Sequence, residues 1–358
     1  MLGLIFLAAV FTNLTFWICL FSRLIWYQDA NEPKPISHKP LDIIVVYKNA
    51  KAQVSHLVPQ LLSQDYSEFQ VIAVDDYSTD GMNWEDSKAL HSPHFKGIKA
   101  TLDQPGKKAA LQEAIDSSRA EVILLTDADC YPNSQQWAKQ MTNQISASKR
   151  IVLGYSPTTP AAGWLNVFIR YETWMTAIQY LSYAIAGIPY MGVGRNICYQ
   201  RSLVAGYKHD MTLPSGDDDL LVSALANKGN TAICISADAF VYTAGKDSIQ
   251  KYLSQKARHM STAPKYHWWH QLLLSIFAVS QILIYPLFVL AMILEREGRT
   301  LYLMIFITYC VVKMILSYFL MKKLKEELLI LWAPLLDIAL SIYYIVMLIP
   351  MLQSKKDW

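Results

Sequence analysis

The chain has 358 residues, of which 53% are hydrophobic, and a formal net charge of +3. This charge is too small to indicate a nucleic-acid partner, and no stripe of Arg and Lys interleaved with aromatic residues supports one. The five cysteines are scattered without a CxxC pair, which fits neither a zinc site nor a disulfide framework. Apolar residues crowd both ends while the middle has mixed polarity, so we expect an α/β domain between membrane segments.

The first segment is an apolar run over residues 2–22, which has the length of one transmembrane helix. A cleaved signal peptide is the alternative, but the N-terminus has no basic region and the run is followed by the bulky Trp26. We therefore predict a retained anchor over residues 1–27. Basic residues follow it, which by the positive-inside rule places the next domain in the cytosol. Residues 28–40 contain three prolines and are predicted to form a linker.

From Leu41 onward, short apolar runs alternate with polar helical segments, which predicts parallel strands joined by helices. The expected strands are 41–46, 70–74, 97–102, 122–125 and 151–155, and the expected helices are 51–63 and 107–118.

Two of these strands end in pairs of aspartates. Asp75 and Asp76 follow the second strand, and Asp127 and Asp129 follow the strand over 122–125. Alternation along an extended backbone sends Asp127 and Asp129 to the same side, where they can meet one cation or one diphosphate. A lone DxD is more often an ordinary turn, but a second acid pair at the same sheet edge favours a site.

Two glycine-containing segments carry candidate donors. Lys107 opens a helix, where a lysine opposes the helix dipole unless an anion lies nearby; a solvated loop lysine is the alternative. Gly192 and Gly194 permit close approach to a ligand, and Arg195 and Asn196 supply donors. This second segment is not a dinucleotide fingerprint, because no third glycine follows.

Three successive aspartates, Asp217, Asp218 and Asp219, begin another helix, which is expected to run to about Asn227. Helix capping explains part of this pattern. Three acids are more than a cap needs, and their mutual repulsion is expected to raise one pKa towards that of a general base.

Two further segments are predicted to be interfacial helices. Residues 162–188 are rich in Trp and Tyr, which favour the bilayer surface, although a buried core helix is the alternative. Residues 248–262 form a basic helical stretch that contains Gln255, Arg258 and His259.

The C-terminal region, residues 270–352, is predicted to contain about three spans, at 272–294, 300–321 and 328–352. Lys313 and Asp337 lie inside the last two, where a charge is costly unless it is paired, so we expect them to pair between adjacent helices. A break at Trp332–Pro334 into a re-entrant or interfacial pair is the alternative, since Lys355 and Lys356 otherwise lie outside, against the charge rule.

In their order and spacing, these motifs resemble those of membrane-bound members of glycosyltransferase family 2, which are inverting enzymes with the GT-A fold. The resemblance covers about residues 41–265. It rests on five segments: Asp75–Gly81 (DDxSxDG), Gly106-Lys107 (GK), Asp127–Asp129 (DxD), Gly216–Asp218 (the ED motif) and Gln255–Arg258 (QxxRW).

Three positions depart from the family pattern. The segment Val46–Ala50 lacks the Glu of the usual P-x-x-N-E, Asp217 stands where Glu is more common, and His259 replaces the Trp of QxxRW. The absent Glu leaves the recognition of base and ribose open.

The resemblance implies an α/β fold, a Rossmann-like mixed sheet of the GT-A type, with N-terminal and C-terminal transmembrane helices and the domain at 41–265 in the cytosol. It implies hexosyl transfer, with inversion, from a UDP- or GDP-sugar to a lipid or glycan acceptor at the membrane. A processive polysaccharide synthase and an inactive scaffold are the alternatives.

The resemblance also assigns roles to individual residues. Asp218 is the expected general base, and Asp129 with Asp127 is expected to hold Mg²⁺ or Mn²⁺. The remaining expected donor contacts are Asp75, Asp76, Lys107, Gln255 and Arg258, with Asp127 shared; the expected acceptor or secondary residues are Asp217, Asp219, Arg195, Asn196 and His259.

Overall fold

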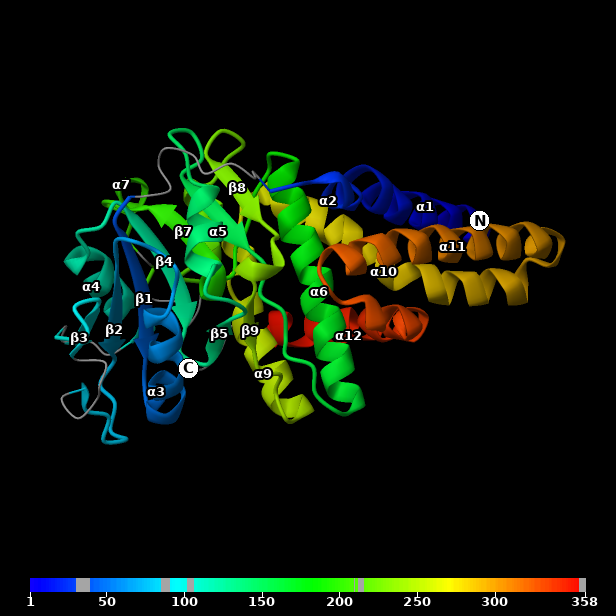
Figure 1. The fold of residues 1–358 in the computed structure, drawn as a ribbon. Coiled ribbons are helices and arrows are strands. Elements are labelled where there is room, and N and C mark those ends of the chain that lie inside the picture. Colours follow the sequence, from blue (N-terminus) through cyan, green and yellow to red (C-terminus); the bar gives the residue numbers. More distant parts are fainter. Residues whose placement is uncertain (30–38, 85–90, 102–105, 209, 212–215, 354–358) are drawn as a thin grey trace. The chain divides into compact units, whose positions relative to one another are not determined.

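The computed structural model describes residues 1–29, 39–84, 91–101, 106–208, 210–211 and 216–353 (Figure 1). The chain forms two compact units. The sheet unit comprises residues 28–159 and 187–245, and the helical unit comprises residues 1–27, 160–186 and 246–358. Most of the predicted linker over 28–40, and the terminal Lys355 and Lys356, lie outside the described residues.

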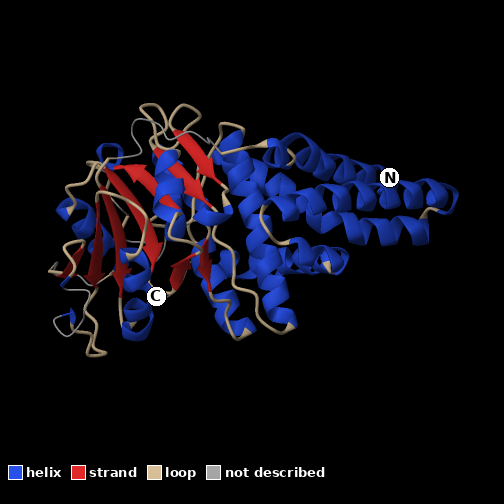
Figure 2. Cartoon of the chain, viewed as in Figure 1, coloured by secondary structure: helices blue, strands red, loops and turns tan. Residues whose placement is uncertain are grey.

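The sheet unit is built on one seven-stranded sheet in the order β3-β2-β1-β4-β7-β6-β8 (Figures 1 and 2). Strands β1 to β4 are parallel, whereas β7 runs antiparallel to both of its neighbours, so the sheet is mixed. The strands are β1 Leu41–Tyr47, β2 Phe69–Asp75, β3 Phe95–Lys99, β4 Val122–Asp127, β6 Ile151–Gly154, β7 Ile197–Gln200 and β8 Thr231–Cys234.

The central strands are buried on both faces, which explains their nearly continuous apolar sequences. On one face, Ile43 and Val45 of β1 share a core with Val54 of α3 and Trp137 of α5. Helix α4 also packs on β1 and β2. The helices of this unit are α3 Lys51–Leu62, α4 Lys107–Ser117, α5 Trp137–Asn143, α7 Arg201–Val204 and α8 Asp219–Leu225.

The predicted strands are present with small shifts of their ends. The third begins at Phe95 rather than Gly97 and ends at Lys99, and the helix after Asp218 ends at Leu225. Strands β7 and β8 were not predicted, and neither was a small second sheet in which β5 (Cys130–Pro132) pairs with β9 (Val241–Thr243).

The helical unit contains three segments that are long and apolar enough to cross a membrane: Leu2–Trp26, Trp268–Leu294 and Arg296–Lys323. The first joins α1 (Leu2–Thr15), a π-helical stretch (Phe16–Phe21) and α2 (Arg23–Trp26). The other helices of the unit are α6 Trp164–Ile185, α9 Ile249–Met260, α10 Trp268–Leu294, α11 Arg299–Lys323 and α12 Ala333–Gln353.

The last predicted span is shorter than expected. A 3₁₀ helix at Glu327–Leu331 precedes α12, which begins at Ala333 instead of continuing from Leu328. The chain therefore changes its helical form at Trp332, as in the alternative with a break at this position. The apolar part of α12 that the structure describes, Ala333–Leu348, is too short to count among the candidate spans.

Helix α6 buries most of its aromatic side chains. Trp174, Tyr180 and Tyr183 are at most 1% exposed, whereas Trp164 at the start of the helix is half exposed. Trp174 packs against Trp17 of the N-terminal segment. This burial favours the alternative that α6 is a core helix of the helical unit, rather than one that turns its aromatic rings to the bilayer.

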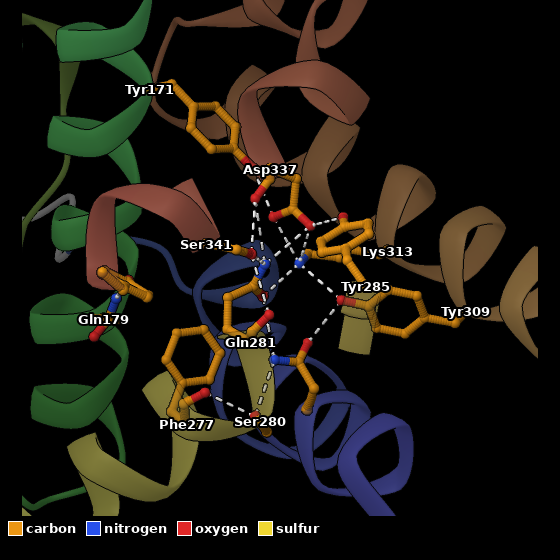
Figure 3. Close-up of polar contacts among 12 residues, drawn as sticks. Tyr171, Gln179, Phe277, Ser280, Gln281, Tyr285, Tyr309, Lys313, Asp337 and Ser341 are labelled. Carbon is orange, nitrogen blue, oxygen red and sulfur yellow. Dashed lines mark hydrogen bonds and ion pairs between the residues drawn. The ribbon is translucent and has the colours of Figure 1, made fainter. Parts of the chain in front are cut away.

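A buried polar cluster joins the helices of this unit (Figure 3). The Nζ of Lys313 on α11 lies 2.7 Å from Oδ1 of Asp337 on α12, and both side chains are less than a tenth exposed. Lys313 also donates to Gln281 Oε1 at 2.8 Å and to the Tyr309 hydroxyl at 2.9 Å, and Tyr171 of α6 donates to Asp337 at 3.2 Å. The pairing of Lys313 with Asp337 is confirmed.

The N-terminal segment enters the same cluster through Asn13. Its amide nitrogen donates to Ser280 at 3.1 Å and to Gln281 at 3.3 Å, and its oxygen accepts from Tyr309 at 3.2 Å. Away from water, such bonds are specific because an unpaired polar group is costly. The cluster therefore links α1, α6, α10, α11 and α12.

Removing one member of the central pair should destabilise the protein. Asp337→Asn leaves the Lys313 charge buried without its counter-ion, at an expected cost of about 3–5 kcal/mol in the free energy of unfolding. The thermal midpoint of protein purified in detergent should fall accordingly. Asp247→Asn, which removes an exposed pair with Lys251, is the control and should change little. An unchanged midpoint for Asp337→Asn would contradict this account.

Candidate active site

The sheet register brings the two acid pairs to one edge. Strand β1 lies between β2 and β4, and Val46 pairs with Val74 on one side and with Asp127 on the other. Asp75, the next residue along β2, pairs with Tyr47. Asp75 and Asp127 are therefore offset by one residue, about 3.3 Å along the strand direction. The expected meeting of both acid pairs at the carboxyl edge of parallel strands is present.

Asp75 and Asp76 are both buried and both accept backbone hydrogen bonds. Asp75 Oδ1 accepts from the amide of Ser78 at 2.8 Å, which closes the turn after β2. Asp76 Oδ1 accepts from the amide of Gly106 at 2.8 Å, and its other oxygen lies 4.0 Å from the Nζ of Lys48. Asp76 thus holds Gly106, the residue directly before Lys107.

The DxD turn is held between the two sheets. Strand β4 ends at Asp127 and β5 begins at Cys130, so only Ala128 and Asp129 form the connection. One ligand atom from each of Asp127, Asp129 and Cys130 lies within 4.8 Å of the others. Burial raises the pKa of the Cys130 thiol, which keeps it protonated. The two carboxylates are the better ligands and fit a hard divalent cation.

Lys107 connects the DxD to the aspartate triplet. Its Nζ donates to Asp127 Oδ1 at 2.8 Å and lies 3.4 Å from Asp217 Oδ2. Burial opposes the charge, but the carboxylates of Asp127, Asp217 and Asp218 outweigh it and hold the pKa of Lys107 well above its usual value. Half of the side chain is exposed, yet it is not a plain solvated loop lysine, since two candidate site acids bind it.

The carboxyl group of Asp218 has a strongly perturbed pKa. Burial raises its pKa well above the usual value, and the charge of Asp217 raises it further, while Lys107 acts in the opposite direction. Burial is thus the larger cause, ahead of the predicted repulsion between neighbouring acids. A raised pKa makes the ionised form a stronger base, which suits a proton acceptor.

The structure gives Gly194 and Asn196 structural roles that the sequence did not indicate. A Cβ at Gly194 would collide with the carboxylate of Asp218, so the close approach here is to a side chain. Asn196 is fully buried; its amide donates to Tyr155 O at 2.7 Å and Ala239 O at 2.8 Å, and its oxygen accepts from Trp137 at 2.9 Å. Asn196 therefore joins the segments at Trp137, Tyr155 and Ala239 instead of presenting donors to a ligand.

The remaining predicted residues lie around this centre or in the other unit. Arg195 donates from Nε to the Ser156 hydroxyl at 2.6 Å, and Asp219 is the first residue of α8. Gln255, Arg258 and His259 lie on α9 of the helical unit, and their part in the site stays a prediction.

Comparison with known proteins agrees with this geometry. Residues 42–193 match the model of the family described as glycosyl transferase family 2. No curated protein matches the sequence. Among solved structures, the mannosyltransferase PcManGT from Pyrobaculum calidifontis, in complex with GDP-Man and Mn²⁺, is similar with a TM-score of 0.62. Its identity is 16%, and the match covers 91% of this chain and 98% of that one. At this identity the likeness concerns the fold.

Two further structures are more distant. TarS 1-349 from S. aureus in complex with UDP-GlcNAc has 15% identity and a TM-score of 0.44, over 80% of this chain and 89% of that one. Glucosyl-3-phosphoglycerate synthase from Mycobacterium tuberculosis has 11% identity and a TM-score of 0.43, over 66% of this chain and 85% of that one. These scores are too low to support an argument about this chain.

The mixed sheet, the acid pairs at its carboxyl edge and the family match lead to one assignment. The predicted α/β class with flanking apolar helices is confirmed. Residues 42–193 therefore lie in a glycosyl transferase family 2 domain with the GT-A fold, and the chain that carries it is a glycosyltransferase.

Proposed function

We propose that this glycosyltransferase moves a sugar from a nucleoside-diphosphate donor to a lipid acceptor at the membrane, with inversion and with the help of a divalent cation. The observation that carries the proposal is the contact of Lys107 with both Asp127 and Asp217. It joins the DxD to the aspartate triplet, so the candidate cation ligands and the candidate base lie in one cluster. The membrane part rests on the three apolar helices.

Asp129 and Asp127 would hold the cation, Mg²⁺ or Mn²⁺, through oxygen ligands. When bound, the cation would supply Lewis-acid neutralisation of the leaving diphosphate. The Mn²⁺ and GDP-Man in the PcManGT complex support this role for the same fold. Lys107, half exposed beside Asp127, can add a second positive charge on the diphosphate side.

Asp218 is the proposed general base. Its burial and its acidic neighbour hold its proton affinity high, and Gly194 leaves room for its carboxylate. Deprotonation of the acceptor hydroxyl as it attacks the anomeric carbon would leave that proton on Asp218. A single displacement of this kind inverts the configuration at that carbon.

The other predicted residues would bind the donor and acceptor. Asp75 and Asp76 are the proposed contacts for the base and ribose, and Gln255 and Arg258 the proposed contacts for the diphosphate, where a guanidinium can bind two oxygens at once. The acceptor is proposed to be a lipid because helices that span the membrane would hold the enzyme close to lipid head groups.

Substitution of either of the two central acids should slow transfer strongly without unfolding the sheet unit. Asp218→Asn removes the base, and we expect a fall in kcat of about 10²–10⁴-fold. Asp129→Ala should remove most of the metal-dependent rate. Asp116→Asn, an exposed acid on α4, is the matched control. Transfer at the wild-type rate by either variant would contradict the site assignment.

The donor and acceptor can be identified together. Membranes that contain the protein should transfer label from one radiolabelled UDP- or GDP-sugar into the chloroform–methanol extract. Membranes with the Asp218→Asn protein provide the blank. Label that appears only in extract-insoluble polymer would contradict the lipid acceptor and favour a processive synthase.

The sheet unit is proposed to lie in the cytosol, in keeping with the basic residues after the first span. Protease added to sealed, right-side-out vesicles should leave an antibody-detected sheet-unit fragment intact. The same protease added to inverted vesicles should cleave it. Cleavage from the outer side of sealed vesicles would overturn this topology.

A further inference from the structure

We propose that the ion pair between Glu172 and Lys256 positions helix α9 and thereby aims Arg258 for the transfer reaction. The inference rests on the proposed function, in which Arg258 binds the donor diphosphate. Glu172 and Lys256 are thus positioning residues, with no contact of their own to the reacting atoms.

Helix α9 is attached to the helical unit along one face. Tyr252 is 2% exposed, the most buried residue of the helix. Its ring packs edge-on against Phe168 of α6, with centroids 6.2 Å apart, and lies 6.0 Å from the ring of Tyr343 on α12. Apolar contacts of this kind hold the helix down, but they resist rolling only weakly because they are not directional.

Lys256, one turn further along α9, adds a charged contact. Its Nζ lies 2.6 Å from Glu172 Oε2, and the two side chains are 22% and 7% exposed. The same ammonium lies 5.7 Å from the centroid of the Tyr252 ring. A buried carboxylate without its partner is costly, so this ion pair favours the rotation of the helix that keeps Lys256 beside Glu172.

Because side chains follow the helical repeat, the rotation of α9 about its axis determines the direction in which Arg258 points. Tyr252 and Lys256 are four residues apart and therefore share a face. Arg258 follows Lys256 by two residues, which turns it about 160° around the axis, and its side chain is exposed. If α9 rolled on its buried face, Arg258 on the opposite face would be displaced most, and the buried residues would be displaced little.

The partner helix is itself firmly anchored. Three consecutive residues of α6 bind three different elements: Arg170 pairs with Glu326 before α12, Tyr171 donates to Asp337 on α12, and Glu172 pairs with Lys256 on α9. Glu172 also accepts from Thr176 at 3.1 Å. A site residue is held most precisely when its support rests on such a packed element.

The test compares variants of the full-length enzyme in detergent or membranes. Glu172→Gln and Lys256→Met should each lower kcat by about 10–100-fold, as expected when a group that acts on developing charge is misplaced by about an ångström. Lys256→Arg keeps the charge and should stay within about threefold of the wild-type kcat. Lys251→Met removes an exposed pair on the same helix and is the matched control.

A double-mutant cycle separates positioning from simple stability. If Glu172 acts through Arg258, then Glu172→Gln should cost at most about twofold once Arg258→Lys is present, since coupled residues are not additive. Binding of UDP and GDP with Mn²⁺, measured by calorimetry, gives a second cycle that does not depend on turnover.

Two results would overturn the inference: folded Glu172→Gln and Lys256→Met proteins with the wild-type kcat, or an undiminished cost of Glu172→Gln in the Arg258→Lys background. Failure of the proposed function has a different signature. In that case the wild-type enzyme itself transfers no sugar from any UDP- or GDP-sugar and binds neither nucleotide.

Discussion

The candidate site depends on one cation held among carboxylates of the protein itself. Asp127 ends β4 and Asp217 precedes α8, and Lys107, at the start of α4, contacts both. Without a positive charge between them, these partly buried acids and Asp218 would repel one another. Lys107 therefore makes the cluster of acids compatible with folding. A metal-bound diphosphate would add a second cation and new anions to this cluster, and its ion pairs would then rearrange.

Much of this arrangement could be predicted because it follows from local sequence patterns. The apolar runs set β1, β2 and β4, and parallel pairing then places Asp75 and Asp127 at one edge. The contacts of Lys107 and Gly194 could not be predicted in the same way. Each joins segments far apart in sequence, and neither a lysine at a helix start nor a glycine before a strand indicates which acid it will meet. Strand β7 is short and buried, so it lacks the alternation that marks a strand.

In the helical unit, too, some features could be predicted from the sequence and others could not. Its long apolar helices are evident from composition, and the pairing of Lys313 with Asp337 follows from the cost of an isolated charge among apolar helices. The roles of Asn13 and Gln281 could not be predicted, because nothing in the sequence indicates the partner of a single amide in an apolar helix. The aromatic content of α6 suggested a bilayer surface, but Trp174 is buried; ring composition alone does not separate a lipid-facing helix from a packed one.

The departure from the family pattern after β1 has a structural counterpart. The retained Asn49 adopts a left-handed backbone (φ 49°), which Asn tolerates well, and its side chain accepts from the amide of Thr79 at 2.7 Å. Ala50 stands where the family has Glu and is the N-cap of α3, which it cannot cap. Asp80 accepts from the amide of Lys51 at 2.8 Å and supplies the missing acceptor at this helix start. The loops after β1 and β2 therefore stay joined without that Glu, so its loss leaves the frame around Asp75 and Asp76 intact.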